Sequence, residues 1–333
     1  MPAPSIPLPG RRRGVIALLS TIALASGAAW GAEAAFPSKP IRLVVPFPPG
    51  GSTDLLARRI GEKLASALGQ PVIVDNKPGA GGTLGSDFVA KSPADGYTLL
   101  FGVTGSNAIA ASLYPKLPYD PAKDFAPVSL VVSAPLVLTV NAASRFKSVT
   151  DVIAYAKQNP ERFSHGSPGA GTSMHLTGEM FAHATETKLT HVPYKGSAPA
   201  LNDLMGGQID AMFGDLLVVG PLVKEGKLRA LAVSSAQRNP MLPEVPTLAE
   251  SGLKGFEALS WQGIFAPVAT PAAVLSRLTT EVVKAVRSDE LKDFFAQRGF
   301  VVEARSQEDS RRFIASEIPK WGRIVKLSGA SAQ

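Results

Sequence analysis

The stretch "IRLVVPFPPGGSTDLLARRIGEKLASALG", residues 41–69, joins a short apolar run to an amphipathic run of helical period. Its first seven residues have the length and the β-branched content of a strand. Leu56, Ile60, Leu64 and Leu68 then recur every four residues, so they share one face of a helix that Gly69 is placed to end. The segment "PPGGSTD" between them must turn the chain from a strand into a helix.

The same alternation of strand and helix patterns continues along the chain. "PVIVDN" at 71–76 and "YTLLFGV" at 97–103 predict two further strands, with a short helix over 83–91 before the second. A second series begins with the strand "APLVLTVN" at 134–141. It continues with helices over 149–158, from about 172 and over 198–205, the strand "LRALAVSS" at 228–235, and a helix from Pro271. This order predicts an α/β fold of mainly parallel sheets flanked by helices.

Length and composition predict two lobes. The chain has 333 residues, 45% of them apolar, which is enough to bury a large core. The stretch "NPMLPEVPTLAESGLKGFE", residues 239–257, is rich in proline and glycine and lacks periodicity, which marks a long connection. We therefore predict a first lobe built from residues 35–137 and 258–333, and a second lobe built from residues 138–257.

The N-terminus has the features of a signal peptide. Arg11, Arg12 and Arg13 precede the apolar stretch "GVIALLSTIALASGAA", and "AEA" at 32–34 suits a signal peptidase. We predict a signal peptide over 1–34, with cleavage before Ala35; a retained membrane anchor is the alternative. The chain contains no cysteine, hence no disulfide, thiolate site or lipid-anchored cysteine. The expected location is the bacterial periplasm, as a soluble protein.

Several function classes lack support in the sequence. The net charge is +7, but the basic residues are scattered among acids, so no nucleic-acid partner is expected. "GAGGTLG" at 79–85 misses the dinucleotide fingerprint because Leu84 replaces its last glycine. His165, His175, His183 and His191 form no metal-binding motif. We expect no cofactor and no metal.

Two loops have the pattern of an anion site. Gly50 and Gly51 precede Ser52 and Thr53 at a predicted helix start, and "SHGSPGAGTSMHL" at 164–176 repeats this arrangement in the other lobe. Helix N-termini present unpaired N–H groups, and the helix dipole favours a negative charge there. The alternative is that the hydroxyl groups only cap the helices. Neither loop contains Lys or Arg, so selectivity for a carboxylate would depend on the geometry of the donors.

From Phe36 onward the chain resembles the Bug family of periplasmic solute-binding receptors, which serve tripartite tricarboxylate transporters. The resemblance rests on these motifs: "FPSKPIRLVVPFPPGGSTDLLAR", "VDNKPGAGGTLGSDFVAKSPADGYTLLFG", "GSPGAGTSMHL", "HVPYKGSAPALNDLMGGQIDAMF" and "GKLRALAVSSAQRNPMLPEVPTLAESG".

The resemblance implies a two-lobed type II periplasmic-binding-protein fold of the Venus flytrap kind. Such a receptor is monomeric and not an enzyme. It closes on a small di- or tricarboxylate, amino dicarboxylate or aromatic acid and delivers it to the membrane subunits of a transporter. Two alternatives are a ligand-presenting sensor for a two-component system, and a serine hydrolase with Ser173 or Ser106 as nucleophile and a histidine as base.

The resemblance also implies the binding residues. The two loops contribute Phe47, Pro49, Gly50, Gly51, Ser52, Thr53, Gly169, Ala170, Gly171, Thr172 and Ser173. Candidates for the variable wall are Thr104, Ser106, Asn107, Ser133, Tyr194, Phe213 and Asp215. We expect Asp215 to face solvent, since aspartates after short strands usually lie in turns. If it faced the ligand instead, an amino group on the ligand would be favoured, because an unpaired buried charge is costly.

Overall fold

The computed structural model describes residues 1–5 and 36–331. The predicted signal peptide, 1–34, and its cleavage site lie almost entirely outside the described residues. Residues 1–38 form one unit and the chain from Lys39 onward forms a second, compact one, which contains all the elements below.

The first sheet contains the three parallel strands that the sequence predicts, joined by antiparallel strands from later in the chain. Its strands are β2 (Val72–Asn76), β1 (Ile41–Val45), β3 (Thr98–Val103), β9 (Leu259–Pro267), the first part of β4 (Phe125–Asn141) and β10 (Val301–Val302). The accompanying helices are α1 (Ser52–Leu68), η1 (Ala80–Gly82), α2 (Thr83–Ala90), η2 (Gly105–Ile109), α3 (Ala110–Leu113), α8 (Ala272–Val286) and α9 (Asp289–Ala296).

The second sheet begins on the last part of β4, which pairs antiparallel with two strands. Its other strands are β7 (Ala211–Asp215), β5 (Ser164–Ser167), β6 (Thr190–Pro193) and β8 (Leu228–Val233). Its helices are α4 (Val149–Gln158), α5 (Ser173–Thr185), α6 (Ser197–Met205) and α7 (Leu216–Lys224).

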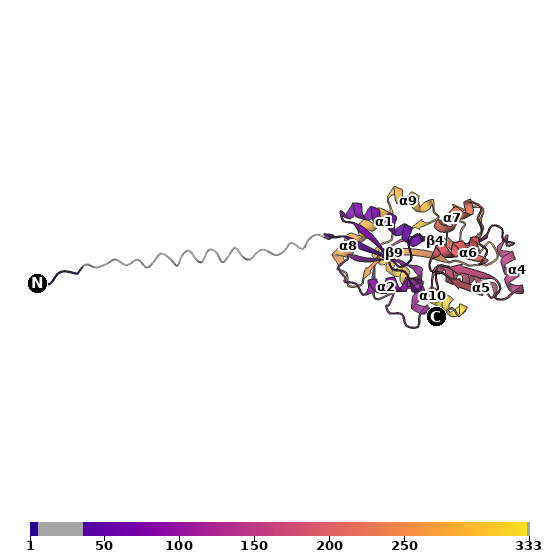
Figure 1. Cartoon of the computed structure of the whole chain (residues 1–333), viewed down its shortest axis with the longest axis horizontal. Helices are drawn as coiled ribbons and strands as arrows, with labels where there is room; N and C mark the ends of the chain where they lie inside the picture. The colour runs from indigo at the N-terminus through magenta and orange to yellow at the C-terminus, as the bar shows by residue number, and fades with distance from the viewer. Residues whose placement is uncertain (6–35, 332–333) are drawn as a thin grey trace. The chain divides into compact units, whose positions relative to one another are not determined.

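Strand β4 belongs to both sheets. It pairs with β9 as far as Pro135 and with β7 from Leu136 onward. Figure 1 shows β4 and β9 running between the helices α1, α2 and α8 and the helices α4 to α7. The two-lobed α/β fold is confirmed, but the sheets are mixed: within residues 36–331, the parallel strand pairs are β1–β2, β1–β3, β5–β6 and β5–β7, and the others are antiparallel. The lobe boundaries at 137/138 and 257/258 stay a prediction.

Local signals placed most early elements correctly. Helix α1 ends at Leu68, and Gly69 takes the left-handed conformation (φ 67°) that a C-terminal glycine permits. Strand β4 is the main exception, because it begins at Phe125, nine residues before the predicted start. Its residues are buried on both faces as far as Val140, so no polar alternation marks its first half.

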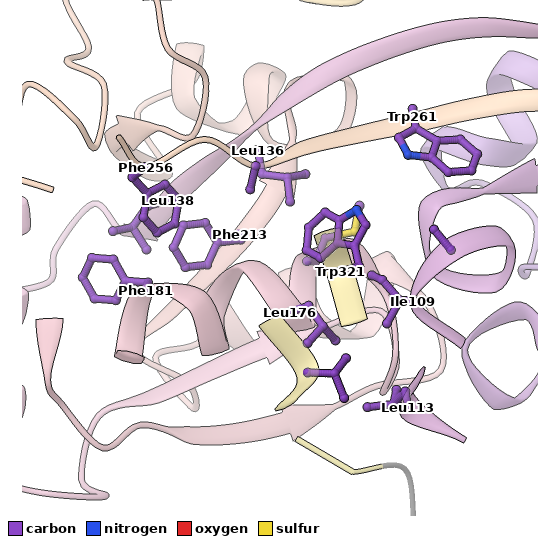
Figure 2. Packing of buried hydrophobic residues seen from close by; sticks show 14 of the residues in the cluster. Ile109, Leu113, Leu136, Leu138, Leu176, Phe181, Phe213, Phe256, Trp261 and Trp321 are labelled. Atoms are coloured by element: carbon purple, nitrogen blue, oxygen red, sulfur yellow. The ribbon is translucent and has the colours of Figure 1, made fainter. Parts of the chain in front are cut away.

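Helix α10 (Gln307–Ser328), the last element of the chain, packs against helices that accompany both sheets, including η2 and α5. Its Trp321 is fully buried and shares a cluster with Ile109 of η2 and Leu176 of α5, as Figure 2 shows. Buried Glu317 accepts hydrogen bonds from the indole N–H groups of both Trp261 and Trp321, at 2.9 and 2.8 Å. The C-terminal helix thereby fixes β9 and the second sheet to one core.

No helix within residues 1–5 and 36–331 is both long and apolar enough to span a membrane.

Candidate functional site

A cavity with about 680 Å³ of empty space, part of it open to solvent, lies where loops from the two sheets meet. The lining residues are Phe47, Pro48, Pro49, Gly51, Ser52, Thr53, Val103, Gly105, Pro168, Thr172, Ser173, Met174, Lys195, Gly196, Ser197, Ala198, Pro199, Asp215, Ser260 and Gln262.

The N-termini of four helices face this cavity. Residues from the first turn or the N-cap of α1, α5, α6 and α7 all line it. Three of the four N-caps, Gly51, Gly196 and Asp215, make no side-chain capping hydrogen bond. Since the first N–H groups of a helix have no partner within the helix, these three termini offer donors to a ligand. The positive ends of the four helix dipoles favour an anion there.

The first loop is held in place by Asp54 and not by a helix cap. The Asp54 carboxylate is 2% exposed and accepts hydrogen bonds from Gly50 N–H at 3.0 Å, Arg58 Nε at 3.0 Å and Asn76 Nδ2 at 3.0 Å. Gly50 takes a positive φ of 87° there. The N-cap is Gly51, which has no side chain to compete with a ligand, so the alternative of simple capping by Ser52 or Thr53 does not describe this loop.

Asp215 corrects our expectation that it faces solvent. It is the last residue of β7, is 0% exposed and lines the cavity. Its Oδ2 accepts a hydrogen bond of 2.5 Å from Ser52 Oγ, which joins the second sheet to α1. Burial raises the pKa of Asp215 to about 6, against the opposing effect of the Ser52 hydrogen bond. The turn that we expected here is instead the buried start of α7.

The second loop is only partly directed to the cavity. Thr172 caps α5 by accepting a hydrogen bond from His175 N–H at 3.3 Å, as the capping alternative proposed. The N–H of Gly171 is also used, since it donates to His175 Nδ1 at 3.2 Å. Of the predicted residues in this loop, Thr172 and Ser173 line the cavity.

Three of the four histidines lie together beneath the second loop. The rings of His175 and His191 are stacked, with their centroids 3.7 Å apart, and the ring centroid of His165 lies 5.0 Å from that of His191. Glu179 Oε1 is 3.5 Å from Nε2 of both His165 and His175. Burial lowers the pKa of His191 to about 2. No group of at least three His, Cys, Asp or Glu residues in the described part of the chain could hold a metal ion. His191 Nε2 lies 2.7 Å from Ser167 Oγ and His175 Nδ1 accepts from Gly171 N–H, so the cluster supports the loop.

A third loop, which the sequence analysis did not single out, completes the second-sheet side of the cavity. Lys195, Gly196 and Ser197 precede α6 and line the cavity. Lys195 is the only cationic residue in the described lining. The signal was present in the sequence, because "KGS" before a helix repeats the glycine–hydroxyl pattern of the first two loops.

Ten predicted site residues do not line the cavity, and six of these make other contacts. Thr104 bonds the backbone of Trp261, Ser106 bonds Asn107, Ser133 bonds Glu303 and Tyr194 bonds Asp203. Phe213 is packed in the main hydrophobic core. The complete set of predicted residues outside the lining is Gly50, Thr104, Ser106, Asn107, Ser133, Gly169, Ala170, Gly171, Tyr194 and Phe213. Eight remain: Phe47, Pro49, Gly51, Ser52, Thr53, Thr172, Ser173 and Asp215.

Strand β9 contributes two further lining residues, Ser260 and Gln262. No local signal marks them, because they reach the cavity through the return of a distant strand. Ser260 Oγ accepts a hydrogen bond from Ser173 Oγ at 3.1 Å. Among the described contacts, neither Ser173 nor Ser106 is hydrogen-bonded to a histidine, so the geometry gives no support for a serine nucleophile activated by a base.

Known proteins share this fold. The chain matches the family described as "Tripartite tricarboxylate transporter family receptor" over residues 56–330. It is 39% identical over 296 residues to Protein BugT of Bordetella pertussis, covering 89% of this chain and 91% of BugT. The structure of R. palustris Rpa4515 with adipate matches with a TM-score of 0.86 at 38% identity, covering 89% of this chain and 99% of that one. MatC from Rhodopseudomonas palustris with bound malate matches with a TM-score of 0.83 at 33% identity, covering 87% and 100%.

The fold and the cavity therefore define a two-lobed solute-binding protein. The chain belongs to the TctC family of tripartite tricarboxylate transporter receptors, and its resemblance to the Bug proteins is confirmed. This is a family of receptors and not of enzymes, so the receptor prediction holds over the hydrolase alternative.

Proposed function

We propose that this protein is a periplasmic receptor that binds a small carboxylate in the cavity and delivers it to the membrane subunits of a tripartite tricarboxylate-type transporter. The observation that carries the proposal is the convergence of the N-termini of α1, α5, α6 and α7 on one cavity. Two similar receptors contain the carboxylates adipate and malate, which supports this ligand class.

The binding energy required is within reach of this arrangement. Micromolar affinity corresponds to about −8 kcal/mol. Each helix dipole contributes about 0.3–2 kcal/mol to an anion at its N-terminus, and charge-assisted hydrogen bonds add more. We propose the backbone N–H groups at the uncapped N-termini of α1 (Ser52, Thr53) and α6 (Ser197) as the principal donors, with Ser173 of α5 beside them and Phe47 as an apolar wall.

Thermal denaturation tests the ligand class. Copurified ligand is first removed by unfolding and refolding, and the protein is then melted with mono-, di- and tricarboxylates, amino acids and aromatic acids. A ligand at a hundred times its Kd stabilises the folded state by about 2.7 kcal/mol, which gives a clear rise in Tm. Absence of a shift with every acid would overturn the proposal.

A charge placed at one N-terminus tests the carrying observation directly. Gly51→Asp puts a carboxylate at the N-cap of α1, where a β-carbon has room: the nearest atom is Ser197 Oγ at 3.9 Å. We expect it to stabilise the helix and to lower carboxylate affinity at least a hundredfold through repulsion and occupied donors. Ser288→Asp, at the N-cap of α9 away from the cavity, is the matched control and should bind normally.

Delivery and location need separate measurements. Cells that carry this protein and the membrane subunits should accumulate the labelled ligand, and deletion of either component should abolish uptake. If the protein binds the ligand but uptake does not depend on it, the binding function stands and the proposed delivery to the transporter is refuted. N-terminal sequencing of the periplasmic fraction should give Ala35 as the first residue.

A further inference from the structure

Asp215 is unexpected in a cavity that otherwise favours anions. It is the only acidic residue in the described lining, and it is 0% exposed. Its Oδ2 accepts a hydrogen bond from Ser52, while Oδ1 has no hydrogen-bond partner in the described residues. Leaving a buried acceptor without a partner is unfavourable, and more so when the group is charged.

The Asp215 carboxylate also makes no hydrogen bond to the N–H groups of the first turn of α7, the helix that it precedes. Asp215 is the N-cap of α7, where an aspartate side chain ordinarily accepts a hydrogen bond from the second or third N–H of the helix. It makes no such bond here and is turned toward the cavity and Ser52. An aspartate that does not cap its own helix, and whose Oδ1 has no hydrogen-bond donor within the described part of the protein, is expected to accept a hydrogen bond from the ligand.

The second unsatisfied acceptor in the cavity lies on β9. Gln262 is 2% exposed, lines the same cavity, and its Oε1 has no partner in the described part of the chain. The helix N-termini supply donors, whereas Asp215 and Gln262 supply acceptors. A ligand that matches both must carry hydrogen-bond donors in addition to its carboxylate.

We propose that Asp215 selects a carboxylate ligand that also carries an ammonium group, a proposal that rests on the carboxylate receptor function above. A ligand whose only charged groups are carboxylates would place a negative charge close to the carboxylate of Asp215, and the two would repel each other in a site of low dielectric. An ammonium group reverses this interaction and has three donors for the unpaired oxygens. A hydroxyl group would satisfy one oxygen but leave the charge of Asp215 uncompensated.

Titration calorimetry on matched ligands tests the proposal. The refolded, ligand-free protein is titrated with aspartate, malate and succinate, with glutamate and glutarate, and with 2-aminoadipate and adipate. We expect the amino member of the best-binding set to bind at least tenfold more tightly than the member without the amino group. In Asp215→Asn this preference should disappear through loss of affinity for the amino acid, while affinity for the plain dicarboxylate stays equal or rises.

A neutral cavity residue provides the control. Ser260→Ala removes a polar group from the same lining and should change both members of a pair alike, so that the preference remains. Tighter or equal binding of the plain or hydroxylated dicarboxylate by the unmodified protein would overturn the role of Asp215 and leave the receptor function intact. Failure of every acid in the panel to bind would refute the receptor function itself.

Discussion

At the scale of single residues, two buried aspartates show that environment and not residue type decides protonation. Asp54 and Asp215 are 2% and 0% exposed. Burial would raise the pKa of Asp54, but hydrogen bonds from Arg58, Gly50 and Asn76 bring it below the ordinary value. Asp215 has one donor, Ser52, and burial raises its pKa to about 6. The first carboxylate holds a loop, and we propose that the second binds the ammonium group of a ligand.

We predict that Asp215→Asn stabilises the ligand-free protein at neutral pH. An acid whose pKa is higher in the folded state destabilises folding above that pKa, and the cost disappears below the unfolded value near 4. The gain should therefore be on the order of 2–3 kcal/mol above about pH 6 and close to zero at pH 4. Urea unfolding at pH 7.5 and pH 4 measures the difference; a gain independent of pH would contradict the assigned cause.

The opposite sign is expected for Asp54→Asn. A carboxylate whose pKa is lowered by folding stabilises the protein above its unfolded value near 4, and this contribution is lost as the pH falls through the folded pKa. The variant should lose about 2 kcal/mol or more at pH 7, because hydrogen bonds to a charged group are weakened. Urea unfolding at pH 7.5 and at about pH 2 should show a smaller loss at the acidic pH. Equal losses at these two pH values would show that ionisation of Asp54 is not involved.

The two aspartates also mark how far sequence reasoning extends at this scale. Asp54 interacts with Gly50 and Arg58, four residues away on either side, which local patterns can suggest. Asp215 accepts its hydrogen bond from Ser52, which lies 163 positions earlier in the chain. No local signal reports such a contact, so the expectation of an exposed turn failed at the residue most informative about the ligand.

At the scale of elements, helix α10 depends on one buried acceptor. Glu317 is 4% exposed and accepts from the indoles of Trp261 and Trp321. We predict that Glu317→Leu, which leaves two buried N–H groups without a partner, costs about 2–5 kcal/mol. Glu317→Gln keeps an acceptor and should lose less. Thermal unfolding measures both.

The control for this prediction lies on the same helix. Glu308 has a side chain that is 74% exposed and pairs with Arg312 on the surface, so Glu308→Leu should change stability by less than about 0.5 kcal/mol. Similar losses in the two leucine variants would show that the effect comes from the helix surface and not from the tryptophan contacts.

Elements with local signals were predictable, and elements defined by packing were not. Helix α1 has an apolar stripe and a terminal glycine, and its bounds match the prediction. Strand β9, with eight of its nine residues buried, carries no alternation, and its position between β3 and β4 depends on contacts across more than a hundred residues. Its contribution of Ser260 and Gln262 to the cavity therefore lay beyond the sequence.

At the scale of the whole molecule, loops of the two sheets touch next to the cavity. A β-carbon on Gly81 would collide with the carbonyl oxygen of Ala170, and one on Gly105 would lie 2.8 Å from the carbonyl oxygen of Gly171. Tyr114 Oη donates to Ala80 O at 2.9 Å beside the same contact. Glycines at these positions permit the close approach of backbones.

We predict that Gly81→Ala weakens ligand binding at least tenfold by holding the two sheets apart. Gly81 has a φ of 62°, so the substitution also strains the loop. Gly69→Ala, at a φ of 67° with no atom within 4 Å of the added carbon, reproduces the strain without the collision. Calorimetry should show normal affinity for Gly69→Ala. An equal loss of affinity in both variants would show that backbone strain, and not closure, controls binding.

The chain's return through β9 has a consequence for biogenesis. β9 lies between β3 and β4, so the first sheet stays split until residues 259–267 have left the ribosome. Central pairings between distant segments form late and slowly. A nascent chain without β9 therefore cannot complete the first sheet, and the export that we propose for this protein requires such an incompletely folded chain.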